Sequence, residues 1–180
     1  DCSLIEDLYC RGNSITNLSF PNNTSLKKLM CFGNSLERID FSNCTELETV
    51  TIWDCGNDNI DVDINLSHCT KLYDFSLSYV CGNNVNINLA GCLSLITGIH
   101  FGLSFNAIKS KLNVSGCNAL TYLNCSSINL TEINISGCSS LESLDCSYNA
   151  LTSLDIADCI NLNSLNCRRN QLYSIDISSN

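Results

Sequence analysis

Leucine, asparagine and cysteine recur along this chain at one fixed phase, and the clearest copies of the pattern lie 21 residues apart. One copy comprises Leu141, Leu144, Cys146, Asn149, Leu151, Leu154, Ile156 and Cys159. The next copy begins at Leu162, and the same frame runs near the N-terminus from Leu26 to Cys44. A period in the twenties is typical of a solenoid, in which each repeat packs only against its neighbours. The pattern therefore predicts the architecture directly and says far less about a ligand.

The pattern extends over all 180 residues, so we expect one domain of about eight repeats. These repeats start near Ile5, Leu26, Leu47, Leu72, Leu95, Leu120, Leu141 and Leu162. The first two and the last three keep the short period, whereas the middle three are longer and less regular. Cys2 and Asn180 fall at the position that Cys44 and Cys159 occupy in complete repeats, so we expect both ends to be truncated.

Alternation within each repeat predicts extended segments on two walls. In Leu-x-x-Leu-x-Cys the second leucine and the cysteine are two residues apart, which is the strand period, so both are expected to point inward. Segments such as Leu154-Asp155-Ile156 supply a second inward–outward–inward piece that is too short for a helix. We therefore expect a parallel β-sheet on one wall, and extended or 3-10 segments with little α-helix on the other.

The fifth repeat permits two frames. Three extra residues before Gly98 would place Phe101, Leu103, Asn106 and Ile108 at the standard positions, and we favour this frame. The alternative frame points Ile99 and Phe101 inward.

Asparagines recur where the expected strand ends and the chain turns, at positions 13, 34, 106, 149 and 170. A buried turn leaves backbone groups without partners, and a short amide side chain can both donate to them and accept from them. The series is interrupted at Cys55, Val80 and Ile128, which indicates a structural role rather than a catalytic requirement.

The fourteen cysteines fall mainly into two phases of the repeat. The corner phase holds Cys2, Cys44, Cys69, Cys92, Cys117, Cys138 and Cys159, and the strand phase holds Cys10, Cys31, Cys125, Cys146 and Cys167. Ile52 and Leu77 replace the strand cysteine, which indicates small buried hydrophobic side chains. Neighbouring strands ~4.8 Å apart bring stacked cysteines within disulfide range, but parallel side chains lack the facing geometry of that bond. We expect mostly reduced thiols, with Cys55–Cys81 as the pair best placed to be an exception.

Charge and motif content argue against several classes of function. A net charge of −9 and a pI near 4.4 disfavour nucleic acid or an anionic membrane surface as partner, and no apolar run approaches a membrane span. The chain lacks a Cys-x-x-Cys motif, a histidine pair, a phosphate-binding glycine loop and a nucleophile elbow, so we expect neither enzymatic activity nor a cofactor.

One carboxylate cluster, formed by Asp54, Asp58, Asp61 and Asp63, could supply calcium ligands. Its spacing matches no EF-hand loop, so a solvated acidic loop is the favoured interpretation.

Outward positions of the expected strands form columns that collect aromatic and arginine side chains, which protein interfaces enrich. The candidate binding residues are Tyr9, Arg11, Met30, Phe32, Trp53, Tyr79, Phe105, Tyr148, Arg168 and Arg169. Most of them lie in the N-terminal half. The alternative is that loops cover these rings or that the rings stack on one another.

The repeat resembles the leucine-rich repeat family, whose pattern is Leu-x-x-Leu-x-Leu-x-x-Asn/Cys-x-Leu, most closely in repeats one, two, seven and eight. Its Leu-x-Cys-x-x-Asn and Ile-Asp-x-Ser-x-Cys forms look like the short repeats of bacterial surface and secreted proteins, including the internalin-like group. The resemblance implies a right-handed superhelix with the parallel sheet on its concave face. It also implies a role in protein recognition or adhesion at the cell surface or after secretion. A glycan-binding module and a passive spacer for another domain remain the alternatives.

Overall fold

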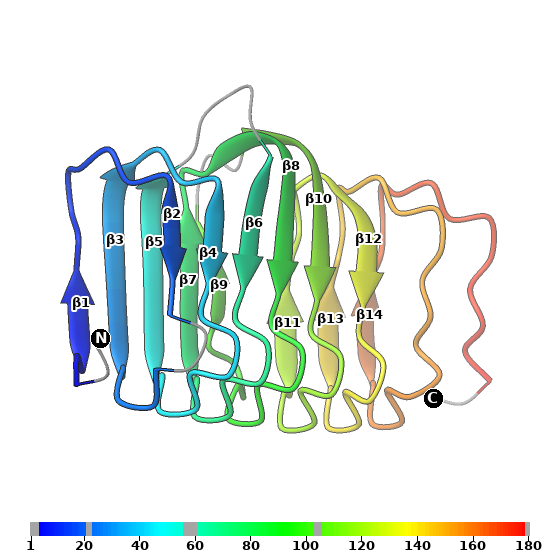
Figure 1. The fold of residues 1–180 in the computed structure, drawn as a ribbon. Helices are drawn as coiled ribbons and strands as arrows, with labels where there is room; N and C mark the ends of the chain where they lie inside the picture. Colours follow the sequence, from blue (N-terminus) through cyan, green and yellow to red (C-terminus); the bar gives the residue numbers. More distant parts are fainter. Residues whose placement is uncertain (1–3, 21–22, 56–60, 103–105, 179–180) are drawn as a thin grey trace.

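The computed structural model describes residues 4–20, 23–55, 61–102 and 106–178, which form two walls of parallel strands (Figure 1). The first wall contains β1 (Asp7–Tyr9), β3 (Lys28–Asn34), β5 (Thr49–Cys55), β7 (Asp74–Ser78), β9 (Ile99–Phe101), β11 (Tyr122–Asn124), β13 (Ser143–Asp145) and β14 (Ser164–Asn166). The second wall contains β2 (Asn17–Ser19), β4 (Arg38–Asp40), β6 (Val62–Asn65), β8 (Cys81–Asn88), β10 (Asn106–Asn113) and β12 (Leu130–Asn134). Over these described ranges the chain forms no α-helix, and so none that could cross a membrane.

Both walls grow because strands pair with the equivalent strand of the next repeat. β1, β3, β5, β7 and β9 pair in that order, and the even-numbered strands from β2 to β12 do the same. β11, β13 and β14 form a further sheet that continues the first wall beside β9, where the Thr121 amide donates to the Ile96 carbonyl over 2.8 Å. The result is a parallel β-solenoid of about seven turns, which confirms the predicted solenoid.

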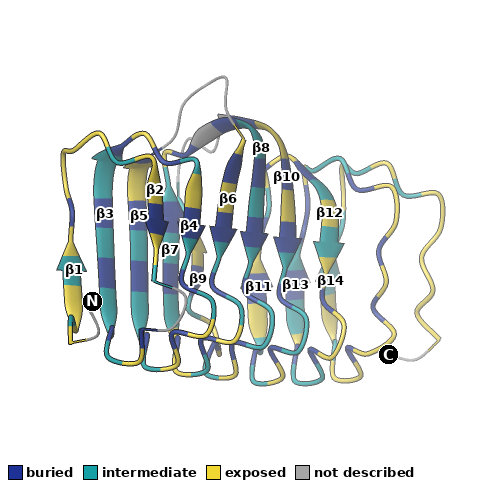
Figure 2. Cartoon of the chain, viewed as in Figure 1, coloured by how far each residue is buried: buried dark blue, intermediate teal, exposed yellow. Residues whose placement is uncertain are grey.

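In-register pairing stacks equivalent side chains into one continuous core. Leu29, Val50, Phe75 and Ile99 occupy matching positions on successive first-wall strands, and all four are buried. Figure 2 shows the consequence, with buried segments recurring along the stacked strands. The predicted alternation is confirmed in β3, where Leu29 and Cys31 are buried and Met30 and Phe32 are half-buried.

The second wall is extended rather than 3-10. Its six strands pair into one parallel sheet, and inward residues such as Ile39, Ile64 and Ile87 stack in register. Of the two conformations that the sequence left open for this wall, the extended one is therefore confirmed over the described strands.

The favoured frame of the fifth repeat is wrong, and the alternative is confirmed. β9 pairs Ile99 with Phe75 and Phe101 with Leu77, so Ile99 is buried and Phe101 packs against the core. Ile108, which the favoured frame placed at an inward position, is 66% exposed. Gly98 makes the confirmed frame possible, because the backbone runs very close to the preceding repeat at this residue. A Cβ on residue 98 would lie 1.8 Å from the Tyr73 carbonyl oxygen. Leu103 and the Asn106 side chain lie outside the described part.

Asn34, Asn149 and Asn170 satisfy backbone groups at the turns, as predicted, and they also bridge consecutive repeats. The Asn149 amide nitrogen donates to the carbonyl oxygens of Cys125 (2.8 Å) and Cys146 (2.9 Å), and its oxygen accepts from the Leu130 amide (3.0 Å). Asn34 makes equivalent bonds to the Cys10 carbonyl and the Ile15 amide. One side chain thus satisfies backbone donors and acceptors of two neighbouring turns, which is the structural role that the spacing indicated.

The corner cysteines are buried and also interact with the preceding repeat. The Sγ atoms of Cys69, Cys92 and Cys117 each lie 3.2–3.3 Å from a backbone carbonyl oxygen one repeat earlier. Free thiols, as predicted, stand at Cys10, Cys31, Cys44, Cys55, Cys69, Cys92, Cys117, Cys125, Cys138, Cys146 and Cys167. The Cys55 thiol approaches Cys31 Sγ at 3.9 Å. The Cys81 side chain and Cys2 lie outside the described part, so the expectation for Cys55–Cys81 stays a prediction.

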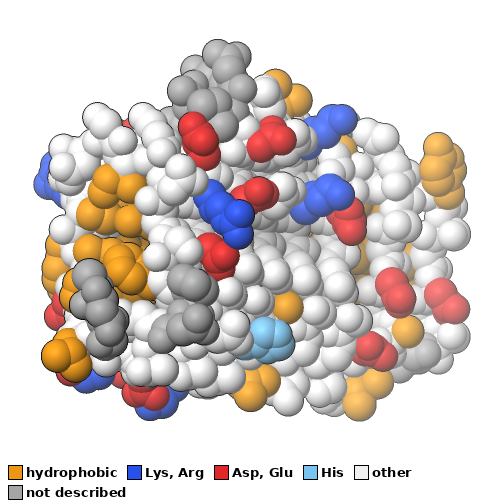
Figure 3. All heavy atoms as spheres, in the orientation of Figure 1, with side chains coloured by type: hydrophobic (Ala, Val, Ile, Leu, Met, Phe, Trp, Pro, Cys, Tyr) orange, Lys and Arg blue, Asp and Glu red, His pale blue; other side chains and the backbone are white. Residues whose placement is uncertain are grey.

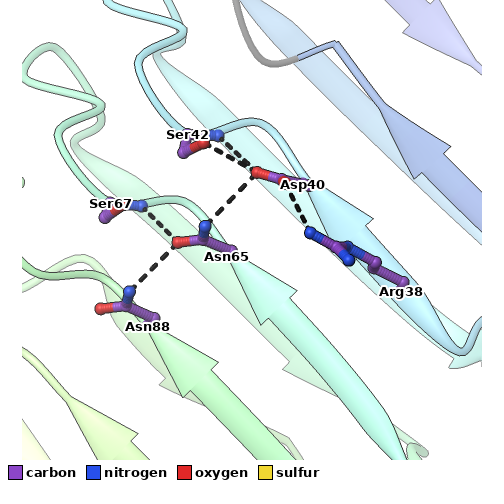
Figure 4. A network of polar contacts seen from close by, with 6 residues as sticks. All are labelled: Arg38, Asp40, Ser42, Asn65, Ser67 and Asn88. Atoms are coloured by element: carbon purple, nitrogen blue, oxygen red, sulfur yellow. Dashed lines mark hydrogen bonds and ion pairs between the residues drawn. The ribbon is translucent and has the colours of Figure 1, made fainter.

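A second series of polar side chains links the ends of neighbouring second-wall strands (Figure 4). The Asn65 amide donates to Asp40 Oδ1 over 3.3 Å, and the Asn88 amide donates to Asn65 Oδ1 over 3.1 Å. Each oxygen also accepts from the backbone two residues later, as Asn65 does from the Ser67 amide. These side chains therefore end each strand and link it to the next repeat.

We predict that removing a side-chain amide that bridges two repeats destabilises the fold far more than removing one that bonds within a single repeat. Asn149→Ala should lower the free energy of unfolding by about 2–3 kcal/mol, because it leaves backbone groups of two turns unpaired. Asn13→Ala is the matched control, since the exposed Asn13 amide bonds only within its own turn, to the carbonyls of Cys10 and Arg11, and should cost below ~1 kcal/mol. Urea unfolding measures both, and equal losses would contradict the bridging role.

We also predict that the fold weakens sharply in alkali. Burial raises the pKa of Cys44 and Cys117 to about 11, and that of Cys69 and Cys138 to about 12, from an ordinary value of 9.0. The contribution of these thiols to the free energy of unfolding is fully present below their ordinary pKa. It is lost as the pH rises toward the pKa in the folded state, because between the two pKa values only the unfolded chain releases the proton. Each thiol then costs up to ~1.4 kcal/mol per pH unit.

Urea midpoints followed by circular dichroism should therefore be constant below about pH 8 and fall steeply above about pH 9. A Cys44→Ala, Cys69→Ala double variant should show a shallower fall. A midpoint that stays constant to about pH 10.5 would show that these thiols are not buried.

Candidate binding surface on the first wall

Outward side chains of the first wall include nearly all of the predicted binding residues. Tyr9 is 59% exposed and Trp53 is 50% exposed, whereas Met30 and Phe32 are half-buried between them. Arg11, Tyr79, Tyr148, Arg168 and Arg169 are also exposed. Phe105 lies outside the described residues.

Strand register brings three aromatic rings into one row. Phe32 of β3 pairs with Trp53 of β5, and their ring centroids are 5.8 Å apart with planes at 80°. Tyr79 follows β7, and its ring lies 5.9 Å from that of Trp53 with planes at 35°. The rings thus contact one another, as the alternative interpretation held, and the Trp53 and Tyr79 rings remain about half exposed.

These rings border a hollow of about 430 Å³ that we call the aromatic hollow. Its lining residues are Arg11, Phe32, Gly33, Trp53, Asp54 and Tyr79. Gly33 opens the space between the larger side chains, because a Cβ there would meet only the Gly12 backbone at 3.8 Å. The structure therefore gathers Arg11, Phe32, Trp53 and Tyr79 as predicted, and adds Gly33 and Asp54.

The hollow lies where the strands end in a left-handed turn. Gly12 and Gly33 have φ values of 65° and 58°, and Asp54 and Tyr79 follow in the same column with φ of 53° each. This conformation costs a residue other than glycine roughly 1–2 kcal/mol. The shared phase of Gly12 and Gly33 was the sequence signal that could have identified this turn. In later repeats, residues with side chains therefore occupy this strained backbone position.

Three other predicted residues, Tyr148, Arg168 and Arg169, form a second cluster in repeats seven and eight, whereas Tyr9 and Met30 pair across β1 and β3 and do not line the hollow. The Arg168 guanidinium lies 4.7 Å from the centroid of the Tyr148 ring, a cation–π contact. Tyr148 and Arg169 also have positive φ, at 55° and 57°. Tyr148, Arg168 and Arg169 do not line the aromatic hollow, so the predicted residues do not form a single site.

The acidic cluster is divided between the walls. Asp54 lines the aromatic hollow, whereas Asp61 and Asp63 accept hydrogen bonds from the side-chain amides of Asn84 (2.8 Å) and Asn86 (2.6 Å) beside the second wall. Asp58 lies outside the described residues. Within the described ranges no three histidine, cysteine or acidic residues are grouped as metal ligands would be.

The face over the second wall carries charges of both signs (Figure 3). Arg38 pairs with Asp40 at 3.0 Å, and Lys111 pairs with Glu132 at 2.8 Å. Exposed pairs of this kind contribute little to stability and give this face a polar, mixed surface.

One grouping was missed by the sequence analysis, because Asp74 and His100 are far apart in the sequence and meet only through strand pairing. His100 Nε2 lies 3.8 Å from Asp74 Oδ1, across neighbouring first-wall strands. His100 and Tyr122 border a smaller hollow of about 280 Å³ beside β11. The observed register pairs Ser76 with His100, and the His100 side chain is exposed on the outward face.

Comparison with known proteins gives no relative: no family model, no curated protein and no solved structure matches the chain.

We predict that the strain in the left-handed column can be measured at Tyr148. Tyr148→Gly should be more stable than Tyr148→Ala by about 1 kcal/mol, because both lose the ring and only glycine adopts the positive φ freely. Thermal unfolding of the two variants measures this difference. Equal stability, or a more stable alanine variant, would show that the backbone there is unstrained.

Proposed function

We propose that the chain is a non-catalytic, leucine-rich-repeat-type module that binds a protein partner through the first wall. The support is the match between repeat and strand: positions such as Leu26 and Leu120 lie two residues before β3 and β11, as the Leu-x-x-Leu-x-Cys phase requires. In the same proposal the stack is a right-handed superhelix and the first wall is its concave face.

The aromatic hollow is the observation on which the proposed function depends. It combines three aromatic rings, one guanidinium and one carboxylate around about 430 Å³ of open space. Aromatic and arginine side chains dominate the binding energy of protein interfaces, and they act best in pockets near the centre of the contact.

The size of the wall sets the kind of complex. Eight strands ~4.8 Å apart and about four residues wide offer roughly 500 Å², below the roughly 800 Å² per partner of a standard interface. A partner of this surface would therefore be held by a few strong contacts in the hollow, and the affinity would be modest. Adhesion modules of bacterial surface or secreted proteins, the setting implied by the family resemblance, compensate for modest affinity by multivalency.

Glycan binding is the second candidate. Trp53 and Tyr79 are half exposed with ring planes 35° apart, and Asp54 lies beside them. Rings exposed in this way can stack on a sugar while the carboxylate accepts its hydroxyl hydrogen bonds.

The test compares the wild type with a Phe32→Ala, Trp53→Ala double variant. Truncating two central rings should weaken capture of an extracellular protein partner by about tenfold or more. Tyr122→Ala is the matched control, since Tyr122 is 44% exposed on the same wall but outside the hollow, and it should bind like the wild type. Binding would be measured against surface protein extracts and against a glycan array.

Loss of protein capture in the double variant alone would support the proposed function. If the wild type captures no protein but binds a glycan, and the double variant loses that glycan binding, the result would support the second candidate. Undiminished binding by the double variant would contradict both, provided that circular dichroism shows all three proteins folded.

A further inference from the structure

The aromatic hollow carries one positive and one negative side chain at different places on its rim. Arg11 lies beside Phe32 at the N-terminal end of the row, since Gly12 donates to the Phe32 carbonyl over 2.8 Å. Asp54 is two strands farther along, next to Trp53. Parallel strands are ~4.8 Å apart, so the two backbones are separated by roughly 10 Å. Among the described residues, neither side chain forms an ion pair with a protein group.

We propose that the hollow binds a small zwitterion in which a quaternary ammonium group stands next to an anionic group, as in phosphocholine. The ammonium group contacts the rings of Phe32, Trp53 and Tyr79 near Asp54, and the anion faces Arg11. This assignment rests on the proposed use of the first wall as a binding surface, and it names the chemistry that the wall recognises.

Ring geometry favours an ammonium group over a flat ligand. The Phe32 and Trp53 planes stand at 80°, so they form two sides of a corner rather than one flat platform. A quaternary ammonium group is nearly spherical and is attracted to the negative faces of several rings at once. The Asp54 carboxylate adds direct charge attraction, and the net charge of −9 favours cations over the whole surface.

The Arg11 guanidinium accounts for the second half of the ligand. A bare cation would be repelled by Arg11, whereas a phosphate or carboxylate next to the ammonium group gives that guanidinium a partner. Short zwitterions span less than the roughly 10 Å between the two backbones, which leaves room for both side chains to reach inward.

The chain offers its own reporter, because Trp53 is the only tryptophan in the sequence and its indole borders the hollow. Tryptophan fluorescence would be followed while the intact protein is titrated with phosphocholine, with choline, and with the tert-butyl isostere of phosphocholine, in which carbon replaces nitrogen. Phosphocholine should bind about tenfold more tightly than the tert-butyl isostere, which keeps the shape and the phosphate but lacks the cation and is therefore an anion.

Three variants locate the site. Asp54→Asn should weaken phosphocholine binding about fivefold or more, by removing the charge that faces the ammonium group. Arg11→Gln should weaken phosphocholine binding but not choline binding. Gly33→Asn should abolish both by filling the hollow, and the fold should survive because Asn43 already holds a φ of 65° in this chain. Tyr122→Ala is the control that should change nothing.

Equal affinity for phosphocholine and its tert-butyl isostere would overturn the ammonium assignment. Equal loss of choline and phosphocholine binding in Arg11→Gln, or trimethyl-lysine amide binding as tightly as phosphocholine, would overturn the anionic half. Binding to phosphatidylcholine vesicles that free phosphocholine competes away would identify a lipid headgroup as the source, and binding of the free compound alone would identify a soluble ligand. If ring-dependent protein capture persists without any phosphocholine binding, only the ligand assignment fails.

Discussion

Backbone hydrogen bonds between neighbouring repeats hold every other feature of this chain in place. A single turn has too few apolar contacts to stand alone, so each turn takes its stability from the strands on either side. Links such as the Tyr148 amide to the Arg168 carbonyl, at 2.9 Å, fix the register in which side chains stack. Because the register fixes which side chains become neighbours, it also determines which residues meet on the outward face.

The corners of the solenoid need extra hydrogen-bond partners, because the chain turns there and its buried backbone groups can bond neither to a neighbouring strand nor to water. The amides of Asn34 and Asn149 solve this by bonding to two turns at once, and the corner thiols lie against carbonyl oxygens of the repeat before them. Small side chains suit these positions because larger ones would separate the strands. The same thiols confine the fold to conditions in which they remain protonated.

Much of the fold could be predicted because the same pattern of buried and turn residues recurs in most repeats. Leu29, Val50 and Phe75 recur at the phase that buries them, and the turn asparagines follow at a constant offset. In repeat five the pattern allowed two frames and favoured the wrong one, since Gly98 allows a close approach that no periodic pattern reveals. At the candidate site the pattern identified Phe32, Trp53 and Tyr79, but Asp54 was assigned to an acidic loop because the turn that aims it into the hollow is a matter of backbone φ. The pairing of each second-wall strand into a full sheet also depends on neighbours rather than on local sequence.

Stacking in register is directly visible by nuclear magnetic resonance. Parallel β3, β5 and β7 predict cross-strand nuclear Overhauser contacts that connect Leu29 with Val50 and Val50 with Phe75. They also predict that protection of the backbone amides from hydrogen exchange is highest in these strands and decreases toward β1 and β14. Contacts of the helical type within a repeat, or the absence of contacts between residues one repeat apart, would contradict the solenoid and remove the aromatic hollow with it.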